Sequence, residues 1–222
     1  HTLDADAYRA AVAAIRARVG DDLFIQITSE AAGVYVAARQ REAIAALGDD
    51  DVDGVSIALR ELLRDDADFA PACALFERLA RRGVLIQYIV YGEDDIARYA
   101  SLLKQQAIPP ARHSLLLVIG RYGEQPSTPD ALRRMVEALA RSESSAQWMA
   151  CAFGEREFDC LAAAAELGGH VRVGFENSLR LKGGRIAADN RELVAQWSAP
   201  DRRCARPLAD VRQARAILGA DE

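Results

Sequence analysis

Short apolar runs alternate with amphipathic stretches along the whole chain. The runs are rich in valine, isoleucine and leucine, which is typical of strands that are buried on both faces of a parallel sheet. They predict six strands, over residues 23–28, 55–59, 84–90, 114–119, 148–152 and 170–173. Between the strands, apolar residues recur three and four positions apart, as on one face of a helix. This spacing predicts helices over residues 4–19, 37–47, 69–82, 94–106, 127–140, 157–167, 190–197 and 209–218.

Residues that favour helix ends support several of these boundaries. Asp4 can cap the first helix, and Gly20 can end it. Ser127 and Thr128 offer a capping hydroxyl directly before Pro129, and proline is favoured in a first helical turn. Residues 181–189, which contain two adjacent glycines, predict an irregular loop.

The order of these elements indicates the fold class. Strands that alternate with helices predict an α/β protein with a parallel sheet and right-handed crossovers. Two architectures fit this order, an open doubly wound sheet and a closed (β/α)₈ barrel. No G-x-G-x-x-G sequence follows a predicted strand, which argues against the dinucleotide site of a doubly wound sheet. The strands are also uniform along the chain, so we expect a TIM-type (β/α)₈ barrel.

The number of strands is lower than a closed barrel requires. A (β/α)₈ barrel has eight strands and typically about 250 residues. This sequence predicts six of eight strands and opens on a helix that follows His1. We therefore expect residues 1–222 to be a single barrel domain that lacks its first two strands, which would lie in roughly 50 residues upstream of His1. The alternative is that a partner chain closes the sheet, because six strands alone would leave exposed edges.

Composition and charge narrow the class of protein. Apolar residues make up 50% of the sequence, which is enough for one sizeable core. The net charge is −5 and no basic cluster stands out, so we expect neither nucleic acid nor an anionic membrane as a partner. No apolar run approaches the roughly 20 residues that span a bilayer. The cysteines are widely spaced, which favours reduced, mostly buried thiols of a cytoplasmic protein over a zinc knuckle or a disulfide framework. They are Cys73, Cys151, Cys160 and Cys204.

The stretch Gly-Gly-His-Val-Arg-Val-Gly-Phe-Glu-Asn, residues 168–177, places polar side chains at the end of the last predicted strand. In a barrel of parallel strands, the carboxyl ends of the strands carry the chemistry. Arg172, Glu176 and Asn177 are therefore candidate site residues. The alternative is a surface salt bridge that follows a buried strand.

This stretch resembles the signature of the β-keto acid cleavage enzymes, which are also called 3-keto-5-aminohexanoate cleavage proteins. Their usual signature is G-G-H-x-R-x-G-x-E-D, and the resemblance covers nearly all of the chain. The other segments that are similar to the family are residues 24–29, 127–132, 184–194 and 206–210.

The resemblance implies a fold, a reaction and a set of site residues. The family is a zinc-dependent (β/α)₈ barrel that condenses a β-keto acid with acetyl-CoA and releases acetoacetate and a shorter CoA ester. By its place in the signature, Glu176 would be a zinc ligand beside two histidines of an H-x-H pair. Arg172 would orient and support the general base, and a hydroxyl from Thr28 or Ser29 would join the group. Catalytic zinc takes three protein ligands and polarises a carbonyl, which suits this chemistry.

The sequence departs from the family pattern at two places. It contains no H-x-H pair, since its only histidines are His1, His113 and His170. The resemblance implies that the pair lies just upstream of His1. We expect His170 to be a hydrogen-bonded strand histidine and His113 to lie at the surface. The second departure is Asn177, because an amide cannot accept a proton as the family's aspartate can.

Residues that follow the other predicted strands are weaker candidates. They could line a pocket or meet an acidic substrate, but core packing or a position in solvent is an equally good interpretation. These residues are Tyr88 and Tyr91, Arg121 and Tyr122, and Glu155 and Arg156.

We therefore predict a zinc-dependent β-keto acid cleavage enzyme that uses acetyl-CoA and forms a homodimer or homotetramer in the cytoplasm. Two alternatives stay open. One is a non-catalytic or weakly catalytic metabolite-binding relative, marked by Asn177. The other is a different metal-assisted lyase or aldolase reaction.

Overall fold

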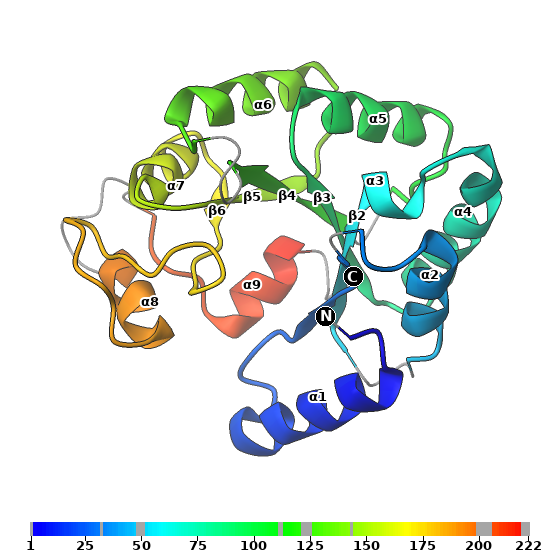
Figure 1. The fold of residues 1–222 in the computed structure, drawn as a ribbon, viewed down its shortest axis with the longest axis horizontal. Helices are drawn as coiled ribbons and strands as arrows, with labels where there is room; N and C mark the ends of the chain where they lie inside the picture. Colours follow the sequence, from blue (N-terminus) through cyan, green and yellow to red (C-terminus); the bar gives the residue numbers. More distant parts are fainter. Residues whose placement is uncertain are drawn as a thin grey trace. The chain divides into compact units, whose positions relative to one another are not determined.

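Strands and helices alternate along the chain in the computed structural model, as the apolar pattern predicts (Figure 1). The structure describes residues 2–31, 33–47, 52–110, 113–120, 126–142, 144–198 and 206–218. The strands are β1 (Gln26–Thr28), β2 (Gly54–Ala58), β3 (Leu85–Val90), β4 (His113–Ile119), β5 (Gln147–Ala152) and β6 (His170–Val171). The helices are α1 (Ala5–Val19), α2 (Ala37–Ala45), α3 (Leu59–Leu62), α4 (Asp66–Arg81), α5 (Glu93–Lys104), α6 (Pro129–Arg141), α7 (Glu157–Glu166), α8 (Asn190–Ser198) and α9 (Val211–Leu218).

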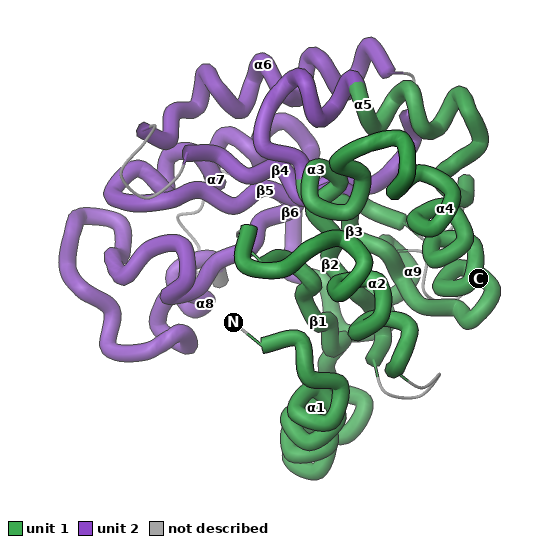
Figure 2. Tube along the Cα trace, turned by 45° about the vertical axis from the view of Figure 1, so that its right-hand side comes forward, with its two compact units in different colours: residues 1–89, 98–114, 209–222 green, residues 90–97, 115–208 purple. Residues whose placement is uncertain are grey.

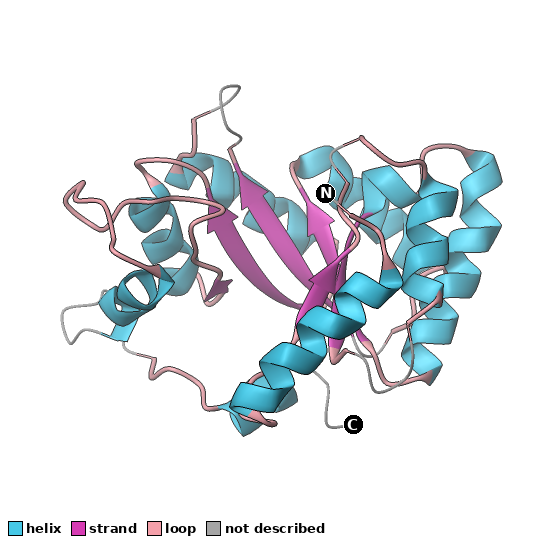
Figure 3. Cartoon of the chain, turned by 60° about the horizontal axis from the view of Figure 1, so that its bottom comes forward, coloured by secondary structure: helices cyan, strands magenta, loops and turns pink. Residues whose placement is uncertain are grey.

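The six strands form one sheet in the order in which they occur along the chain, from β1 to β6. Figure 3 shows the strands in magenta and the helices in cyan. β1 pairs with β2 and β2 with β3 in parallel register, and β5 pairs with β6 in the same way. The predicted α/β class with a parallel sheet is therefore confirmed. No pairing between β1 and β6 is present in the described part of the chain, so the sheet is not closed there.

The chain separates into two compact units (Figure 2). Unit 1 comprises residues 1–89, 98–114 and 209–222, and unit 2 comprises residues 90–97 and 115–208. Each unit contains its own buried strands and helices. Whether residues 1–222 act as a single domain stays a prediction.

The strands of unit 1 carry different residues on their two faces. On one face, Tyr88 is fully buried and packs against Phe76 of α4 and Tyr99 of α5, with ring centroids 5.3 and 6.2 Å apart. Because neighbouring residues of a strand point to opposite faces, Gln87 lies on the other face. Its side chain accepts a hydrogen bond from Gln26 Nε2 at 3.1 Å and donates one to Ser114 Oγ at 3.4 Å. One face is therefore apolar and covered by helices, whereas the other carries a row of polar side chains.

Several predicted boundaries shift by a few residues. β1 begins at Gln26 and not at residue 23, because the Ile25 N–H donates to the Asp53 carboxylate at 2.6 Å and not to a neighbouring strand. α4 begins at Asp66 and not at residue 69, because Asp65 accepts a hydrogen bond from the Asp68 N–H at 3.2 Å and caps the helix. β6 ends at Val171, two residues early.

Other helix ends agree with the predicted caps. Asp4 accepts hydrogen bonds from the Asp6 and Ala7 N–H groups, at 2.9 and 3.4 Å, and caps α1. Thr128 supplies the hydroxyl that caps α6, where it accepts from the Ala131 N–H at 3.1 Å. Ser127 does not cap the helix, since its hydroxyl lies within hydrogen-bond distance of the carbonyls of Ile119, the last residue of β4, and Phe153, at 2.8 and 2.7 Å.

A half-buried carboxylate holds the first and last helices of unit 1 to the sheet. Asp53 directly precedes β2, and its side chain is 13% exposed. It forms ion pairs with Arg16 of α1 and with Arg215 of α9, the latter at 3.1 Å, in addition to its bond from the Ile25 N–H. Three segments that are far apart in the sequence therefore depend on one side chain.

We expect Asp53→Asn to lower the free energy of unfolding by about 2 kcal/mol, because hydrogen bonds to a charged group are worth more than neutral ones. Urea denaturation followed by circular dichroism measures this change. Asp21→Asn is a matched control, since Asp21 also pairs with Arg16 but is 97% exposed. It should change stability by less than about 0.5 kcal/mol. Equal effects of the two substitutions would show that Asp53 is not the side chain that joins these segments.

Candidate functional site

Arg172 is the centre of the polar cluster at the end of β6. β6 pairs with β5 in a register that places His170 beside Met149 and Val171 beside Ala150. The Arg172 N–H continues this pairing by donating to the Ala150 carbonyl at 2.9 Å. The chain then turns, since the N–H groups of Asn177 and Ser178 both donate to the Gly174 carbonyl. The turn brings Glu176 and Asn177 back towards Arg172.

The Arg172 guanidinium contacts both of the other signature side chains. Its Nη2 atom donates to Asn177 Oδ1 at 3.0 Å and to Glu176 Oε1 at 3.2 Å. The same nitrogen lies 3.4 Å from the buried sulfur of Cys151 on β5. The structure therefore brings Arg172, Glu176 and Asn177 together, as the sequence predicts.

The three side chains differ in exposure. Glu176 is 67% exposed and Arg172 is 32% exposed, whereas Asn177 is buried. Asn177 is also held by its main chain, because its carbonyl accepts from the Gly154 N–H at 3.1 Å. Arg172 and Glu176 can therefore contact a ligand from solvent, whereas the buried amide of Asn177 is held in place by its hydrogen bonds.

The loop after the turn is anchored by α8. Asn190, the first residue of α8, accepts a hydrogen bond from the Phe175 N–H through its Oδ1 atom at 2.8 Å. The loop that follows residue 178 was predicted to be irregular, and it contains an isolated antiparallel bridge between Arg180 and Ile186. These contacts hold the main chain near Glu176 and Asn177 in place.

The two glycines that open the signature serve packing and helix termination. Gly168 has a φ of +91°, a conformation that suits glycine, and it ends α7. Gly169 lies against the ring of Trp148 on β5, so that an added Cβ atom would be 2.2 Å from two ring carbons. Arg206 covers this corner, since its guanidinium donates to the carbonyls of Gly168, at 3.1 Å, and Gly169.

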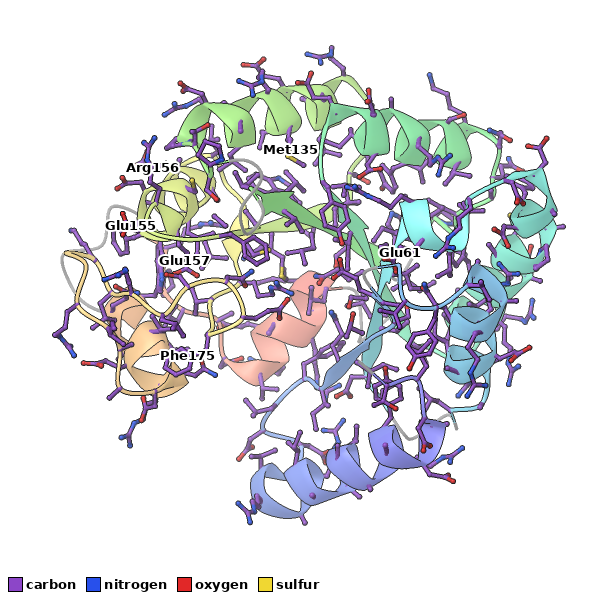
Figure 4. All side chains as sticks on the ribbon, in the orientation of Figure 1. Glu61, Met135, Glu155, Arg156, Glu157 and Phe175 are labelled. Atoms are coloured by element: carbon purple, nitrogen blue, oxygen red, sulfur yellow. The ribbon has the colours of Figure 1, made fainter. Side chains whose placement is uncertain are left out.

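A second carboxyl group, that of Glu157, lies near Arg172. Glu157 is the first residue of α7 and is 3% exposed, unlike the neighbouring Glu155 and Arg156 (Figure 4). Its Oε1 atom is buried and has no hydrogen-bond partner in the described part of the chain. Burial raises the pKa of Glu157 to about 8, and the positive charge of Arg172 opposes this rise in part. Glu157 is therefore mostly protonated at neutral pH.

Sequence reasoning missed Glu157. An acidic residue in the first turn of a helix is common because it complements the helix dipole, so Glu157 gives no distinctive signal. Glu155 and Arg156 were predicted as the candidates at this strand end. Both are exposed, and Glu155 pairs with Arg180 at 3.7 Å.

Thr28 and Ser29 lie in unit 1, at the end of β1. Thr28 is exposed, and its Oγ1 atom accepts from the Glu30 N–H at 3.1 Å. Ser29 is 1% exposed, and its hydroxyl donates to the Ser56 carbonyl at 3.2 Å. The Ser29 hydroxyl is therefore already used in a hydrogen bond within the sheet. Thr28 is the better candidate of the two for a site hydroxyl.

The loop after these two residues is held by a carboxylate that sequence reasoning did not single out. Glu61 of α3 accepts hydrogen bonds from the N–H groups of Ala31 and Gly33, at 2.9 and 3.3 Å, and from Gln40 Nε2 at 3.0 Å. Figure 4 labels Glu61 beside this loop. Glu61 therefore fixes the main chain that leaves β1.

The remaining candidates separate into core residues and residues outside the described part. Tyr88 belongs to the core and does not line a pocket. The prediction that His113 lies at the surface is wrong, because its Nε2 atom bonds to the Tyr99 hydroxyl at 2.8 Å and its ring packs against Tyr88. His170 is half-buried, and burial together with the charge of Arg206 lowers its pKa. Arg121, Tyr122, His1 and Cys204 lie outside the described residues.

No disulfide joins the cysteines that the structure describes. Cys151 and Cys160 are buried and Cys73 is half-buried. Burial raises the pKa of Cys160 to about 11. The predicted reduced and mostly buried thiols are confirmed for these three.

Comparison with known proteins assigns the chain to a family. The family model described as beta-keto acid cleavage enzyme matches residues 1–220. The chain belongs to the β-keto acid cleavage enzyme family. The predicted resemblance to this family is therefore confirmed. The assignment of Arg172, Glu176 and Asn177 to the family signature stays a prediction.

Two curated relatives of this family member are enzymes. The 3-oxoadipate:acetyl-CoA acetyltransferase of Cupriavidus necator is 34% identical over 123 residues, which cover 54% of this chain and 43% of that protein. The 3-keto-5-aminohexanoate cleavage enzyme of Acetoanaerobium sticklandii is 31% identical over 141 residues, or 64% of this chain and 50% of that protein. This chain therefore spans about half the length of the curated relatives it matches.

Solved structures support the fold. Structures of ObcA superpose with TM-scores of 0.69 in the apo form and 0.73 in a binary complex with oxaloacetate. They are 16% and 19% identical to this family member, and the superpositions cover 98% of it and 55 to 56% of ObcA. At this identity, the similarity concerns the fold alone.

The described residues do not by themselves form the predicted zinc site. Within residues 2–31, 33–47, 52–110, 113–120, 126–142, 144–198 and 206–218, no group of three or more His, Cys, Asp or Glu side chains could hold a metal ion. Glu176 has the exposure that a ligand needs, but it is paired with Arg172. The part of the chain that the structure describes also contains no helix long and apolar enough to cross a membrane.

Proposed function

We propose that the complete protein cleaves a β-keto acid in a reaction with acetyl-CoA and releases acetoacetate and a CoA ester. The observation that carries this proposal is a family match over residues 1–220 together with the geometry of Arg172, whose guanidinium holds Glu176 and Asn177 at 3.2 and 3.0 Å.

Arg172 has the features of a group that binds a substrate carboxylate. All of its hydrogen bonds to neighbouring side chains come from Nη2, which leaves the Nη1 atom of the partly exposed guanidinium available for a ligand. A planar guanidinium suits an anionic carboxylate because it can offer parallel N–H donors. The fixed amide of Asn177 then sets the orientation in which Arg172 meets the substrate. The Thr28 or Ser29 hydroxyl as a further site group stays a prediction.

We also propose zinc as the cofactor, with Glu176 as one of its ligands. When bound, the metal would polarise the substrate carbonyl as a Lewis acid. A carboxylate oxygen is an ordinary zinc ligand, and Glu176 is exposed enough to bind one. Among the described residues, Glu176 belongs to no group of three or more potential metal ligands. A homodimer or homotetramer and a cytoplasmic location likewise stay predictions.

The direct test is a turnover assay on the complete protein with acetyl-CoA and each of two β-keto acids, 3-oxoadipate and 3-keto-5-aminohexanoate. These are the acids in the names of the curated relatives. We expect acetoacetate and a new CoA ester to form in equal amounts with at least one acid. Cleavage that proceeds without acetyl-CoA would instead identify a different lyase or aldolase reaction.

A second candidate function rests on Asn177. An amide in place of a carboxyl group removes one proton acceptor from the site, so the protein could bind its metabolite and turn it over weakly or not at all. Binding of a β-keto acid in equilibrium dialysis, without any acetoacetate, would favour this candidate over the enzyme.

A further inference from the structure

The reaction proposed above requires a group that exchanges a proton. Forming and breaking a carbon–carbon bond next to a carbonyl passes through an enolate, so a C–H proton must leave and another must return. The amide of Asn177 cannot accept it. Glu176 is exposed, paired with Arg172 and proposed as a metal ligand. The site within unit 2 therefore needs another group that can accept and return a proton.

Glu157 is a carboxyl group with the right surroundings. Its side chain is buried and close enough to Arg172 to feel its charge, and its Oε1 atom makes no hydrogen bond to the described residues. The Nε atom of Arg172 is also buried and has no hydrogen-bond partner there. One atom is an acceptor and the other is a donor, and no ion pair joins the two side chains among the described contacts. An oxygen atom of a ligand or a water between them could accept from Nε and exchange a proton with Oε1.

The groups around Glu157 leave Arg172 as its main electrostatic partner. Arg172 is the charged group that acts on the Glu157 carboxyl from the end of β6. On α7 itself, Cys160 lies one turn along and keeps its proton at neutral pH, since burial raises its pKa to about 11. Arg156 and Asp159 are exposed neighbours on the same helix. Glu157 is thus a carboxyl that is kept mostly neutral by burial and can ionise near a fixed positive charge.

We propose that Glu157 takes up and returns the substrate proton in this protein, a role that the amide at position 177 cannot perform. The proposal rests on the proposed function. The ionised Glu157 accepts a proton from a C–H bond next to a carbonyl, directly or through one water, and the electron pair of that bond stays on the substrate as an enolate. Glu157 then returns the proton to the enolate carbon that carbon–carbon cleavage releases. Over one catalytic cycle, the protein therefore has no net gain or loss of protons.

The test compares Glu157→Gln with the wild-type protein and with the double variant Glu157→Gln/Asn177→Asp. We expect Glu157→Gln to lower kcat at least about 100-fold, which is the lower range for loss of a general acid–base group. It should also remove the change of kcat with pH near 8. The double variant should regain at least about tenfold of this loss, because it restores a carboxyl group beside Arg172. Glu166→Gln is the matched control, since Glu166 is exposed at the other end of α7.

Stability measurements separate this role from a structural one. A pKa raised from 4.5 to about 8 means that the folded protein keeps the Glu157 proton at pH values where the unfolded chain has lost it. The wild-type protein should therefore lose stability as pH rises from about 5 to about 9, whereas Glu157→Gln should not show this part of the loss. A variant that is at least as stable as the wild type at pH 7 but slow in turnover fits the proposal.

Two kinds of result would overturn the inference. If the wild-type protein forms acetoacetate and Glu157→Gln keeps its kcat and pH profile, the proposed function stands and the role of Glu157 falls. The same holds if kcat falls but Asn177→Asp restores none of it. If the wild-type protein forms no acetoacetate from any β-keto acid tested, the proposed function fails first, and the inference fails with it.

Discussion

Replacing Arg172 by lysine should lower kcat/KM for the β-keto acid at least about 100-fold in the complete protein. Lysine keeps the positive charge but offers a single compact donor group. It could not hold Glu176, Asn177 and a substrate carboxylate at once, as the guanidinium can. Steady-state kinetics at saturating acetyl-CoA, with the β-keto acid varied, measures this loss of kcat/KM.

Arg180→Lys is the matched control for this experiment. Arg180 is exposed in the same unit, donates to the Gly184 carbonyl at 2.8 Å and contacts none of the three signature side chains. Its substitution should leave kcat/KM within about twofold of the wild type, since surface changes away from a site have small effects. An Arg172→Lys variant with wild-type kcat/KM would remove Arg172 from the proposed site.

Replacing Gly169 by alanine should lower the free energy of unfolding by about 3 kcal/mol, at the upper end of the range for overpacking. The added Cβ atom would lie 2.2 Å from two carbons of the Trp148 ring and 2.6 Å from a third. The ring cannot move away easily, because Trp148 belongs to β5, which pairs directly with β6. Urea denaturation followed by circular dichroism measures the loss.

Two further variants show whether the Trp148 ring is the cause. Gly92→Ala is the control, because a Cβ atom at Gly92 would meet no atom within 4 Å. It should change stability by less than about 0.5 kcal/mol. Trp148→Leu should reduce the cost of Gly169→Ala when the two substitutions are combined, as expected for residues in direct contact. If Gly169→Ala is as stable as Gly92→Ala, then the second signature glycine is not required by packing.

The sequence predicts the order of elements well because each strand is a short apolar run between more polar segments. Asp4 and Thr128 form caps where the sequence places them. Boundaries fail where long-range contacts decide. The start of β1 depends on Asp53, which is 28 residues away from Ile25, and no local pattern reveals that contact.

The candidate site is predictable in part for a similar reason. Arg172 and Glu176 are four residues apart around a tight turn, so their contact follows from local sequence. The packing of α7 on β5 and β6 places Glu157 near Arg172, and the spacing of these two residues in the sequence does not. His113 was predicted as a surface residue because a polar neighbour precedes it, yet its environment is set by Tyr88 and Tyr99. Burial of polar side chains is a tertiary property, and sequence patterns do not encode it directly.

A crystal structure of the complete protein with a bound β-keto acid would test the central claim most directly. We predict that the substrate carboxylate lies within about 3 Å of the Arg172 guanidinium, with Asn177 still bonded to the same arginine. We also predict that a substrate oxygen or a water lies between Arg172 Nε and Glu157 Oε1. A β-keto acid bound elsewhere, with Arg172 still paired to Glu176 alone, would contradict the account.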